Sequence, residues 1–114
     1  MEKTDSVIQT DWGYELVWST NELYCGKILV FDKIESKIRM QFHKEKDKTW
    51  FINNGQFILT WIDTATGTTH TQNLAEGSTW RVKPLVPHQL QSVVIGSSVT
   101  EVSNTNLQDD LHYI

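Results

Sequence analysis

Apolar and polar residues alternate along most of this chain, and this period of two constrains the fold more than any other feature. In the segment 38–43, three apolar residues alternate with Arg39, Gln41 and His43. Successive side chains of a strand point to opposite faces, so the two sets lie on opposite faces of one strand. The pattern predicts β-strands throughout, and only the tail 106–112 has the character of a short helical turn.

Turn signals separate the expected strands. Apolar or alternating runs cover 13–18, 24–31, 38–43, 50–52, 57–62, 68–74, 78–82, 88–95 and 98–103. The run Asn53-Asn54-Gly55-Gln56 predicts a β-hairpin, because Asn-Gly tolerates positive φ, and residues 64–67 predict a second turn. About eight or nine short strands predict an all-β sandwich or barrel, one domain over residues 1–114.

Charge and cysteine content exclude several classes of protein. The net charge of −4 and the scattered basic residues exclude a nucleic-acid interface, which needs a basic face. The single cysteine, Cys25, excludes an internal disulfide and is typical of a reducing compartment. The sequence shows no leader and no apolar run approaching ~18 residues, so we expect a cytoplasmic protein that does not bind membranes.

Five tryptophans are many for 114 residues. Each aromatic side chain buries ~150–250 Å², so core and interface packing is favoured over sugar stacking for any one of them. Near the N-terminus, residues of one parity form an apolar stripe on one strand face: Trp12, Tyr14, Leu16 and Trp18. A stripe of this size predicts a two-fold homodimer, unless the segment merely closes its own barrel.

Two histidines stand at fixed distances from turn glycines. His43 precedes Gly55, and His88 follows Gly77 at the end of a strand and a proline-rich turn. Neutral imidazole is a common ligand for transition metals, and a metal site needs several donors that the fold brings together. Both histidines lie at strand ends of an all-β chain, so the sequence predicts that they meet at one metal ion or one substrate.

The first of these spacings resembles a motif of the cupin superfamily, G-x5-H-x-H-x3,4-E-x6-G. Gln41 and His43 stand at the positions of its two histidines, and Lys48 stands at the position of its glutamate. Gly55 matches the final glycine.

The second spacing resembles the other cupin motif, G-x5-P-x-G-x2-H-x3-N. Gly77 and His88 match in position, while Lys83, Leu85 and Ser92 replace the proline, the glycine and the asparagine.

The resemblance extends over residues 11–112. Four segments follow, in the same order, the pattern of small cupins called mannose-6-phosphate isomerase-like: Asp11–Glu15, Gly26–Leu29, Met40–Asp47 and Glu101–Asp109. The resemblance implies a single-domain double-stranded β-helix, also called a jelly-roll barrel.

It also implies a function, that of a metal-assisted sugar-phosphate isomerase. In such enzymes a metal polarises the carbonyl and hydroxyl oxygens, and a base moves a proton between adjacent carbons. The resemblance implies a divalent ion (Zn, Mn, Ni or Fe) and a sugar or sugar phosphate as ligand. In this interpretation the residues that act are Gln41, His43 and His88 as metal ligands, Lys27 as a catalytic residue for proton transfer or as a phosphate contact, Arg81 as the alternative phosphate contact, Lys48 as a further substrate contact, and Glu45 as ligand or base.

Lys48 opens two alternatives. An ammonium ~4 Å from a unit positive charge is repelled by roughly 4 kcal/mol at an effective dielectric constant of 20, and by twice that from a divalent ion. In one alternative Lys48 swings away and Glu45, or next Asp47, supplies the missing carboxylate. In the other the ammonium occupies the pocket and binds a phosphate or carboxylate.

The second alternative favours a different function, a non-catalytic small-ligand or sugar-binding cupin with a degenerate metal site. A third function is an assembly module that pairs through a barrel edge. The charged run 44–48 is most simply explained as a solvated loop.

Overall fold

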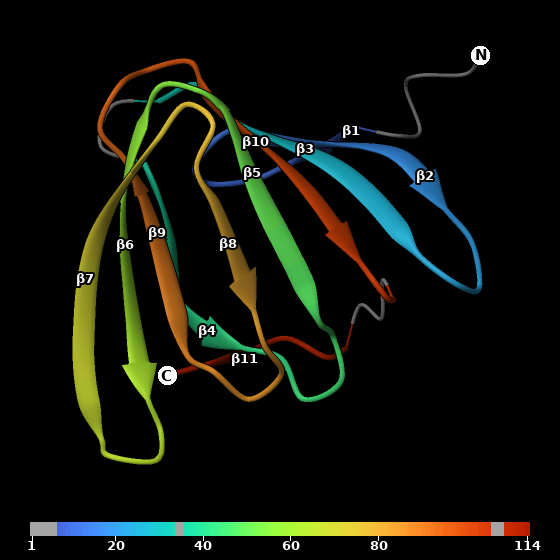
Figure 1. Ribbon diagram of the computed structural model, residues 1–114. Helices are drawn as coiled ribbons and strands as arrows, with labels where there is room; N and C mark the ends of the chain where they lie inside the picture. The colour runs from blue at the N-terminus through green and yellow to red at the C-terminus, as the bar shows by residue number, and fades with distance from the viewer. Residues whose placement is uncertain (1–6, 34–35, 106–108) are drawn as a thin grey trace.

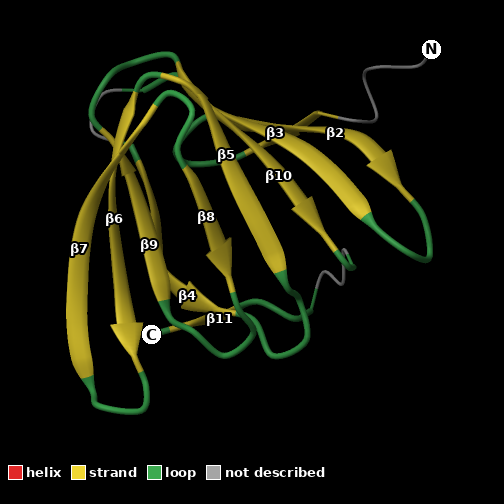
Figure 2. Ribbon diagram, viewed as in Figure 1, coloured by secondary structure: helices red, strands yellow, loops and turns green. Residues whose placement is uncertain are grey.

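The computed structural model describes residues 7–33, 36–105 and 109–114. These residues form eleven strands in two antiparallel sheets that face each other (Figure 1). Strands and connecting loops make up all of the described chain (Figure 2). Within it there is accordingly no helix with the length and apolar character needed to span a membrane.

The larger sheet has six strands in the order β1-β2-β3-β10-β5-β8. Their bounds are Val7–Gln9, Tyr14–Thr20, Cys25–Phe31, Ser97–Ser103, Lys48–Asn54 and Thr79–Val82, in that order. The smaller sheet has five strands in the order β11-β4-β9-β6-β7. Their bounds are His112–Tyr113, Lys37–Phe42, His88–Ser92, Gln56–Asp63 and Thr68–Ala75.

From β3 onward the chain crosses from one sheet to the other at nearly every turn. Strands β3, β5, β8 and β10 lie in the larger sheet, whereas β4, β6, β7, β9 and β11 lie in the smaller one. Each sheet is therefore built from strands that are far apart in sequence: β3 pairs with β10, and β4 pairs with β9. This winding is the double-stranded β-helix, which confirms the all-β jelly-roll prediction.

The turn at Gly55 corrects one prediction. Strands β5 and β6, which flank it, enter different sheets, so Asn53–Gln56 is a corner between sheets and not a hairpin. Gly55 has φ +85°, and a Cβ there would lie 1.9 Å from Oγ of Ser97, so only glycine fits. The Asn-Gly signal reports positive φ, which a corner needs as much as a hairpin does.

Two other turn predictions have different outcomes. The turn at residues 64–67 is a hairpin, because β6 and β7 pair from Gln56↔Ala75 to Asp63↔Thr68. The expected helical turn at 106–112 falls partly on residues 106–108, which lie outside the described residues. At its end, His112 belongs to β11 and pairs with Phe42 of β4.

The core lies between the sheets. Trp12 stacks on Phe31 with ring centroids 4.5 Å apart, and Phe31 meets Phe57 edge-on at 4.9 Å. Trp50 is fully buried, and Trp61 and Trp80 pack against the same cluster, in line with the packing interpretation. Trp12 thus leaves the predicted N-terminal stripe for the core, whereas Trp18 remains 51% exposed.

Candidate functional site

A cavity of about 370 Å³ opens between the two sheets, where β1–β3 face β4 and β11. Five cationic and three anionic side chains line it: Lys27, Lys37, Arg39, Lys46 and Lys48, with Asp11, Glu15 and Glu101. The cavity therefore carries an excess of two positive charges in a chain whose net charge is −4. Charge of one sign in a low-dielectric cleft attracts ligands of the opposite sign.

Strand alternation places Glu101 at the centre of this site. Along β10 the buried residues are Ser97, Val99, Glu101 and Ser103, all of one parity. Glu101 is the register partner of Lys27 on β3 on one side and of Trp50 on β5 on the other. Register partners share a face, so its carboxylate points inward between the two neighbouring strands.

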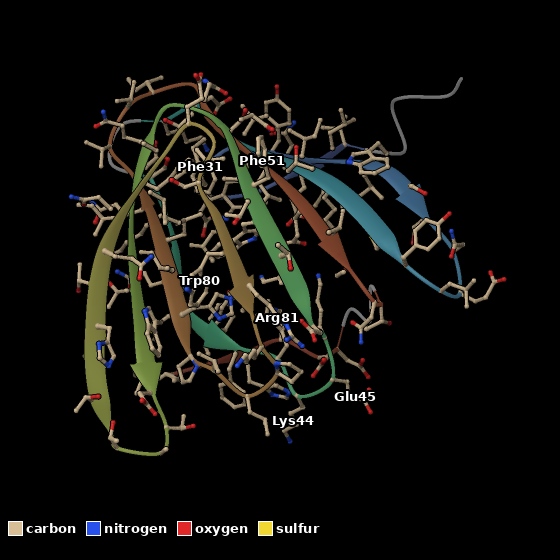
Figure 3. The ribbon with its side chains drawn as sticks, in the orientation of Figure 1. Phe31, Lys44, Glu45, Phe51, Trp80 and Arg81 are labelled. Atoms are coloured by element: carbon tan, nitrogen blue, oxygen red, sulfur yellow. The ribbon has the colours of Figure 1, made fainter. Side chains whose placement is uncertain are left out.

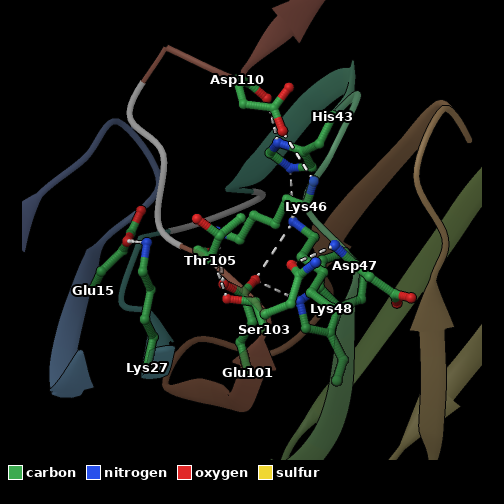
Figure 4. Close-up of polar contacts among 12 residues, drawn as sticks. Glu15, Lys27, His43, Lys46, Asp47, Lys48, Glu101, Ser103, Thr105 and Asp110 are labelled. Atoms are coloured by element: carbon green, nitrogen blue, oxygen red, sulfur yellow. Dashed lines mark hydrogen bonds and ion pairs between the residues drawn. The ribbon is translucent and has the colours of Figure 1, made fainter. Parts of the chain in front are cut away.

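Two lysines and one indole meet this carboxylate, as Figure 4 shows. Nζ of Lys46 lies 3.4 Å from Oε2 of Glu101, and Nζ of Lys48 lies 3.5 Å from Oε1. Nε1 of Trp50 donates a hydrogen bond of 2.9 Å to the same Oε1. A second ion pair joins Lys27 to Glu15 at 2.9 Å on the neighbouring wall.

His43 links this network to the C-terminal segment. Its Nδ1 donates to the carbonyl oxygen of Asp110 at 2.8 Å, because a carbonyl can only accept. Nε2 therefore carries the lone pair, and Nζ of Lys48 donates to it at 3.3 Å. The ammonium of Lys48 thus occupies the side of the ring on which a metal would bind.

His88 has the same tautomer but no such neighbour. Its Nδ1 donates to the carbonyl of Val86 at 2.9 Å, and its Nε2 has no hydrogen-bond partner among the described residues. The ring is 0% exposed and lies beside that of His43, with centroids 5.7 Å apart. The rings of the two histidines therefore lie side by side, but His43 lines the cavity, whereas His88 is buried and does not line it.

The buried charges shift each other's pKa values. Burial by itself raises the pKa of Glu101, but the ammonium groups of Lys48, Lys46 and Lys27 outweigh it and hold that pKa well below its usual range. Burial lowers the pKa of Lys48 to about 8, even though Glu101 acts in the opposite direction. Both groups are charged at neutral pH, so the lysine and the carboxylate form a buried ion pair.

Burial also keeps both histidines neutral. It lowers the pKa of His43 to about 4 and that of His88 to about 2, and the positive charge of Lys48 adds to both shifts. A proton on either ring would add a further charge beside Lys48, in a region that already holds an excess of cations.

These shifts predict a loss of stability in weak acid. Below pH 6.5 the unfolded histidines bind protons that the native protein does not, so the free energy of unfolding falls as pH falls. His88 alone should remove ~2 kcal/mol between pH 7 and pH 5, at 1.36 kcal/mol per pH unit below 6.5, and His43, whose native pKa of about 4 also lies below pH 5, should remove nearly as much. Urea unfolding at the two pH values measures this loss. A His43→Gln variant should flatten the profile, and a flat profile for the parent would contradict the assignment.

Asp110 holds the loop that carries the lysines. Its carboxylate accepts hydrogen bonds from the backbone N–H groups of Lys44, Glu45 and Lys46, at 2.8–3.0 Å. Partial burial raises its pKa, but the three donors outweigh this and lower the pKa to about 2. The segment before β11 therefore fixes both the loop and the orientation of His43.

The loop 83–87 contacts both histidines through its backbone. The N–H of Leu85 donates to the carbonyl of His43 at 2.6 Å, and the carbonyl of Val86 accepts from His88. Leu85 has φ +69° although it is not a glycine. It stands at the motif position of a glycine, the residue that adopts this conformation without strain.

Two substitutions of Leu85, by asparagine and by valine, should therefore change the free energy of unfolding in opposite directions. Its side chain is 57% exposed, so little burial is lost when it is replaced. Leu85→Asn should raise the free energy of unfolding by about 0.5–1 kcal/mol, because asparagine tolerates positive φ, and Leu85→Val should lower it by about 1 kcal/mol. Urea unfolding of the two variants checks this, and equal stability of both would show that the loop is not strained.

The structure brings four of the predicted site residues to the cavity wall: Lys27, Gln41, His43 and Lys48. Glu45 and Arg81 are exposed, which corrects their expected placement at the site. Figure 3 shows Glu45 on the loop after β4 and Arg81 on β8. Glu45 shares the parity of Gln41 and His43 and would face the cavity in a continuing strand, but β4 ends at Phe42.

Arg81 and Asp47 pair with each other on the surface instead. The Arg81 guanidinium donates to Asp47 and lowers the pKa of that carboxyl. On β8 it is Val82, next to Arg81, that faces inward. Asp47 therefore does not supply the missing carboxylate either.

Three functional residues were not predicted from the sequence: Lys46, Glu101 and Asp110. Glu101 could have been found, because it shares parity with Val99 within a predicted strand and a glutamate on the buried face needs a partner. Lys46 lies in the run 44–48 that was interpreted as a solvated loop, yet Lys46 and Lys48 are 7% and 4% exposed. Asp110 acts through contacts distant in sequence.

The residues present do not fit a divalent metal. Both Nε2 atoms are unprotonated, as metal ligands require, but a lysine ammonium donates to that of His43. The described part of the chain holds no group of three or more His, Cys, Asp or Glu placed to share one ion. The nearest carboxylate, Glu101, is paired with Lys46 and Lys48 instead.

Comparison with known proteins identifies the fold. No protein-family model and no curated protein matches the sequence. Among solved structures, oxalate decarboxylase from Bacillus subtilis matches with TM-score 0.85 and 16% identity, over 100% of this chain and 31% of that chain. The capsular polysaccharide assembling protein CapF from Staphylococcus aureus matches with 0.80 and 11%, over 95% and 32%. KdgF from Halomonas sp. matches with 0.73 and 12%, over 96% and 87%.

The chain has the cupin fold. At these identities the likeness shows the fold alone, and one cupin fold supports many chemistries. The chain spans about a third of the oxalate decarboxylase and CapF chains, and most of the KdgF chain. The function of this chain must therefore be argued from its own cavity.

Proposed function

We propose that this cupin binds a small anionic ligand, a sugar phosphate or a sugar acid, and does so without a divalent metal. The observation that carries the proposal is the position of Lys48. The lysine stands where the cupin motif has its glutamate, and its ammonium lies against Nε2 of His43. The site thus offers a cation of its own to an anionic ligand.

The lysines at the cavity wall keep capacity for such a ligand. An ammonium has three N–H donors, and the ion pairs of Lys46 and Lys48 with Glu101 are long, at 3.4 and 3.5 Å. Hydrogen bonds from an ammonium to a phosphate or carboxylate are charge-assisted and are about twice as strong as neutral ones. Gln41 adds an amide to the same wall, suited to a sugar hydroxyl.

Calorimetry with matched ligands tests this proposal. Gluconate and glucose 6-phosphate should bind, and glucose, which lacks an anionic group, should not. Lys46→Gln should weaken gluconate binding by about tenfold, which corresponds to roughly 1.4 kcal/mol. Lys83→Gln, the same change at an exposed lysine, should leave it unchanged. Equal affinity for gluconate and glucose would refute anion recognition.

A second candidate is the metal-assisted sugar-phosphate isomerase of the mannose-6-phosphate isomerase-like cupins. One observation favours it: His43 and His88 both carry their lone pairs on Nε2, the tautomer that metal binding needs. In this candidate Gln41, His43 and His88 hold the ion once Lys48 has moved. Elemental analysis of the purified protein separates the two proposals, since one equivalent of Zn, Mn, Ni or Fe supports the isomerase and no metal supports anion binding.

We also propose that the chain forms a two-fold dimer through the outer face of the larger sheet. This face exposes three large apolar side chains, Trp18, Phe51 and Val102, at 51%, 46% and 47%. Trp18 lies over Gly26, whose register partner is Val102. Phe51 pairs with Thr100, two residues before Val102, so the three apolar side chains share one face. An exposed apolar face of this kind is more stable when a second copy covers it than when it contacts water.

Sedimentation at micromolar concentration should show a dimer, and Phe51→Asp with Val102→Glu should convert it to a monomer. The matched change Leu23→Asp, at an exposed residue outside this face, should leave the dimer intact. A parent protein that sediments as a monomer would defeat the proposal.

A further inference from the structure

We infer that the natural ligand carries two anionic groups separated by a chain of about six carbons, one group for the floor of the cavity and one for its rim. The inference rests on the proposed function and narrows it to a class: aldaric acids and phosphorylated sugar acids. It follows from how the excess positive charge of the cavity is divided between the floor and the rim.

The floor holds one unmatched positive charge. Its cations are Lys27, Lys46 and Lys48, and its carboxylates are Glu15 and Glu101. Figure 4 shows the two ion-paired groups side by side. The three lysines are at most 7% exposed, and an excess charge in such surroundings is costly unless an anion accompanies it. One anionic group of a ligand would neutralise the floor.

The rim holds a second unmatched positive charge. Lys37 and Arg39 of β4 line the cavity and are exposed, and the remaining acidic residue of the lining, Asp11, is exposed too. The guanidinium of Arg39 lies 4.1 Å from the ring centroid of Tyr113, so an aromatic face holds it at the cavity mouth. A planar guanidinium in a fixed position suits a bidentate contact with a carboxylate or phosphate.

Strand geometry separates the two charges. Arg39 lies in β4, and His43, which contacts Lys48, follows four residues later. Strand β4 ends at Phe42 and is irregular between Ile38 and Gln41, so at ~3.3 Å per residue the backbone positions are at most about 13 Å apart, and the long side chains shorten the gap between the charges. The two carboxylates of a six-carbon aldaric acid can reach both the floor and the rim. The carboxylates of oxalate are adjacent and can reach only one of them.

Calorimetry with glucarate and gluconate tests the inference, because the two differ only in a second terminal carboxylate. Glucarate should bind about five- to tenfold more tightly than gluconate, as expected for one anionic group beside two exposed cations. Oxalate should bind no more tightly than a monocarboxylate of its size. The double variant Lys37→Gln with Arg39→Gln should weaken glucarate more than gluconate, so that the advantage of glucarate is lost. Lys44→Gln with Lys83→Gln, which removes the same charge outside the cavity, should preserve the advantage.

Each other outcome points to one failure. Equal affinity for glucarate and gluconate in the parent protein would overturn the two-group inference and leave anion binding intact. A rim variant that weakens both ligands equally would also overturn it, because the rim would then act as a general attraction. If neither ligand binds, the proposed function itself fails.

Discussion

Replacement of Glu101 by glutamine should lower the free energy of unfolding by about 3–5 kcal/mol and Tm by roughly 10 °C or more. The carboxylate is 3% exposed, and it is the partner of both Lys46 and Lys48. Without it these lysines remain buried with no countercharge, and Trp50 loses the acceptor of its indole N–H. Breaking a buried ion pair on one side costs far more than the pair contributes, because one charge is left alone. Thermal and urea unfolding at pH 7 measure the loss.

Two further variants show whether the loss comes from the unpaired lysines. Glu45→Gln makes the same chemical change at an exposed residue and should change stability by less than about 0.5 kcal/mol. Glu101→Gln combined with Lys48→Met removes one of the stranded cations and should recover part of the loss. A Glu101→Gln protein as stable as its parent would show that the carboxylate does not hold the site together.

The positions of the turns could be predicted from the sequence because they depend on local backbone geometry. Gly55 and Leu85 both have positive φ, at the places where the cupin motifs have glycines. The pairing of the strands could not be predicted in the same way. The Asn-Gly turn at Gly55 permits both a hairpin and a corner, and its role as a corner depends on Ser97, which packs against it from a distant strand.

The site was predictable only where strand alternation continues. Gln41 and His43 share a face as expected, and both line the cavity. Strand β4 is irregular between Ile38 and Gln41, however, so Ile38 of the predicted opposite face is buried at the cavity as well, whereas Arg39 is exposed. Beyond Phe42 the strand ends, and the choice between Glu45 and Lys46 as the inward residue is made by backbone hydrogen bonds to Asp110, more than sixty residues away. No local pattern carries that information. Continued alternation would therefore place the acidic Glu45 in the cavity, whereas the structure places the basic Lys46 there.

Replacement of Lys48 by glutamate should create a metal site. Lys48→Glu removes the ammonium that lies 3.3 Å from Nε2 of His43 and puts a carboxylate at the motif position. The new carboxylate would join two unprotonated imidazoles and would lie near Glu101, so a divalent ion would relieve the repulsion between two buried acids. The parent protein repels such an ion by several kcal/mol.

We therefore expect the Lys48→Glu variant to bind Zn²⁺, Mn²⁺ or Ni²⁺ at least a hundredfold more tightly than the parent protein. The bound ion should raise its stability by about 2.7 kcal/mol at a free-metal concentration of 100 times Kd. Calorimetry and metal-dependent Tm measure the two effects. His88→Ala in the same background should abolish the gain, because it removes the buried Nε2 that has no partner of its own among the described residues. Lys44→Glu, the same substitution at an exposed lysine, should bind no better than the parent. If the Lys48→Glu variant also binds no better, the ammonium is not what keeps a metal out, and the separation of the two histidines becomes the explanation.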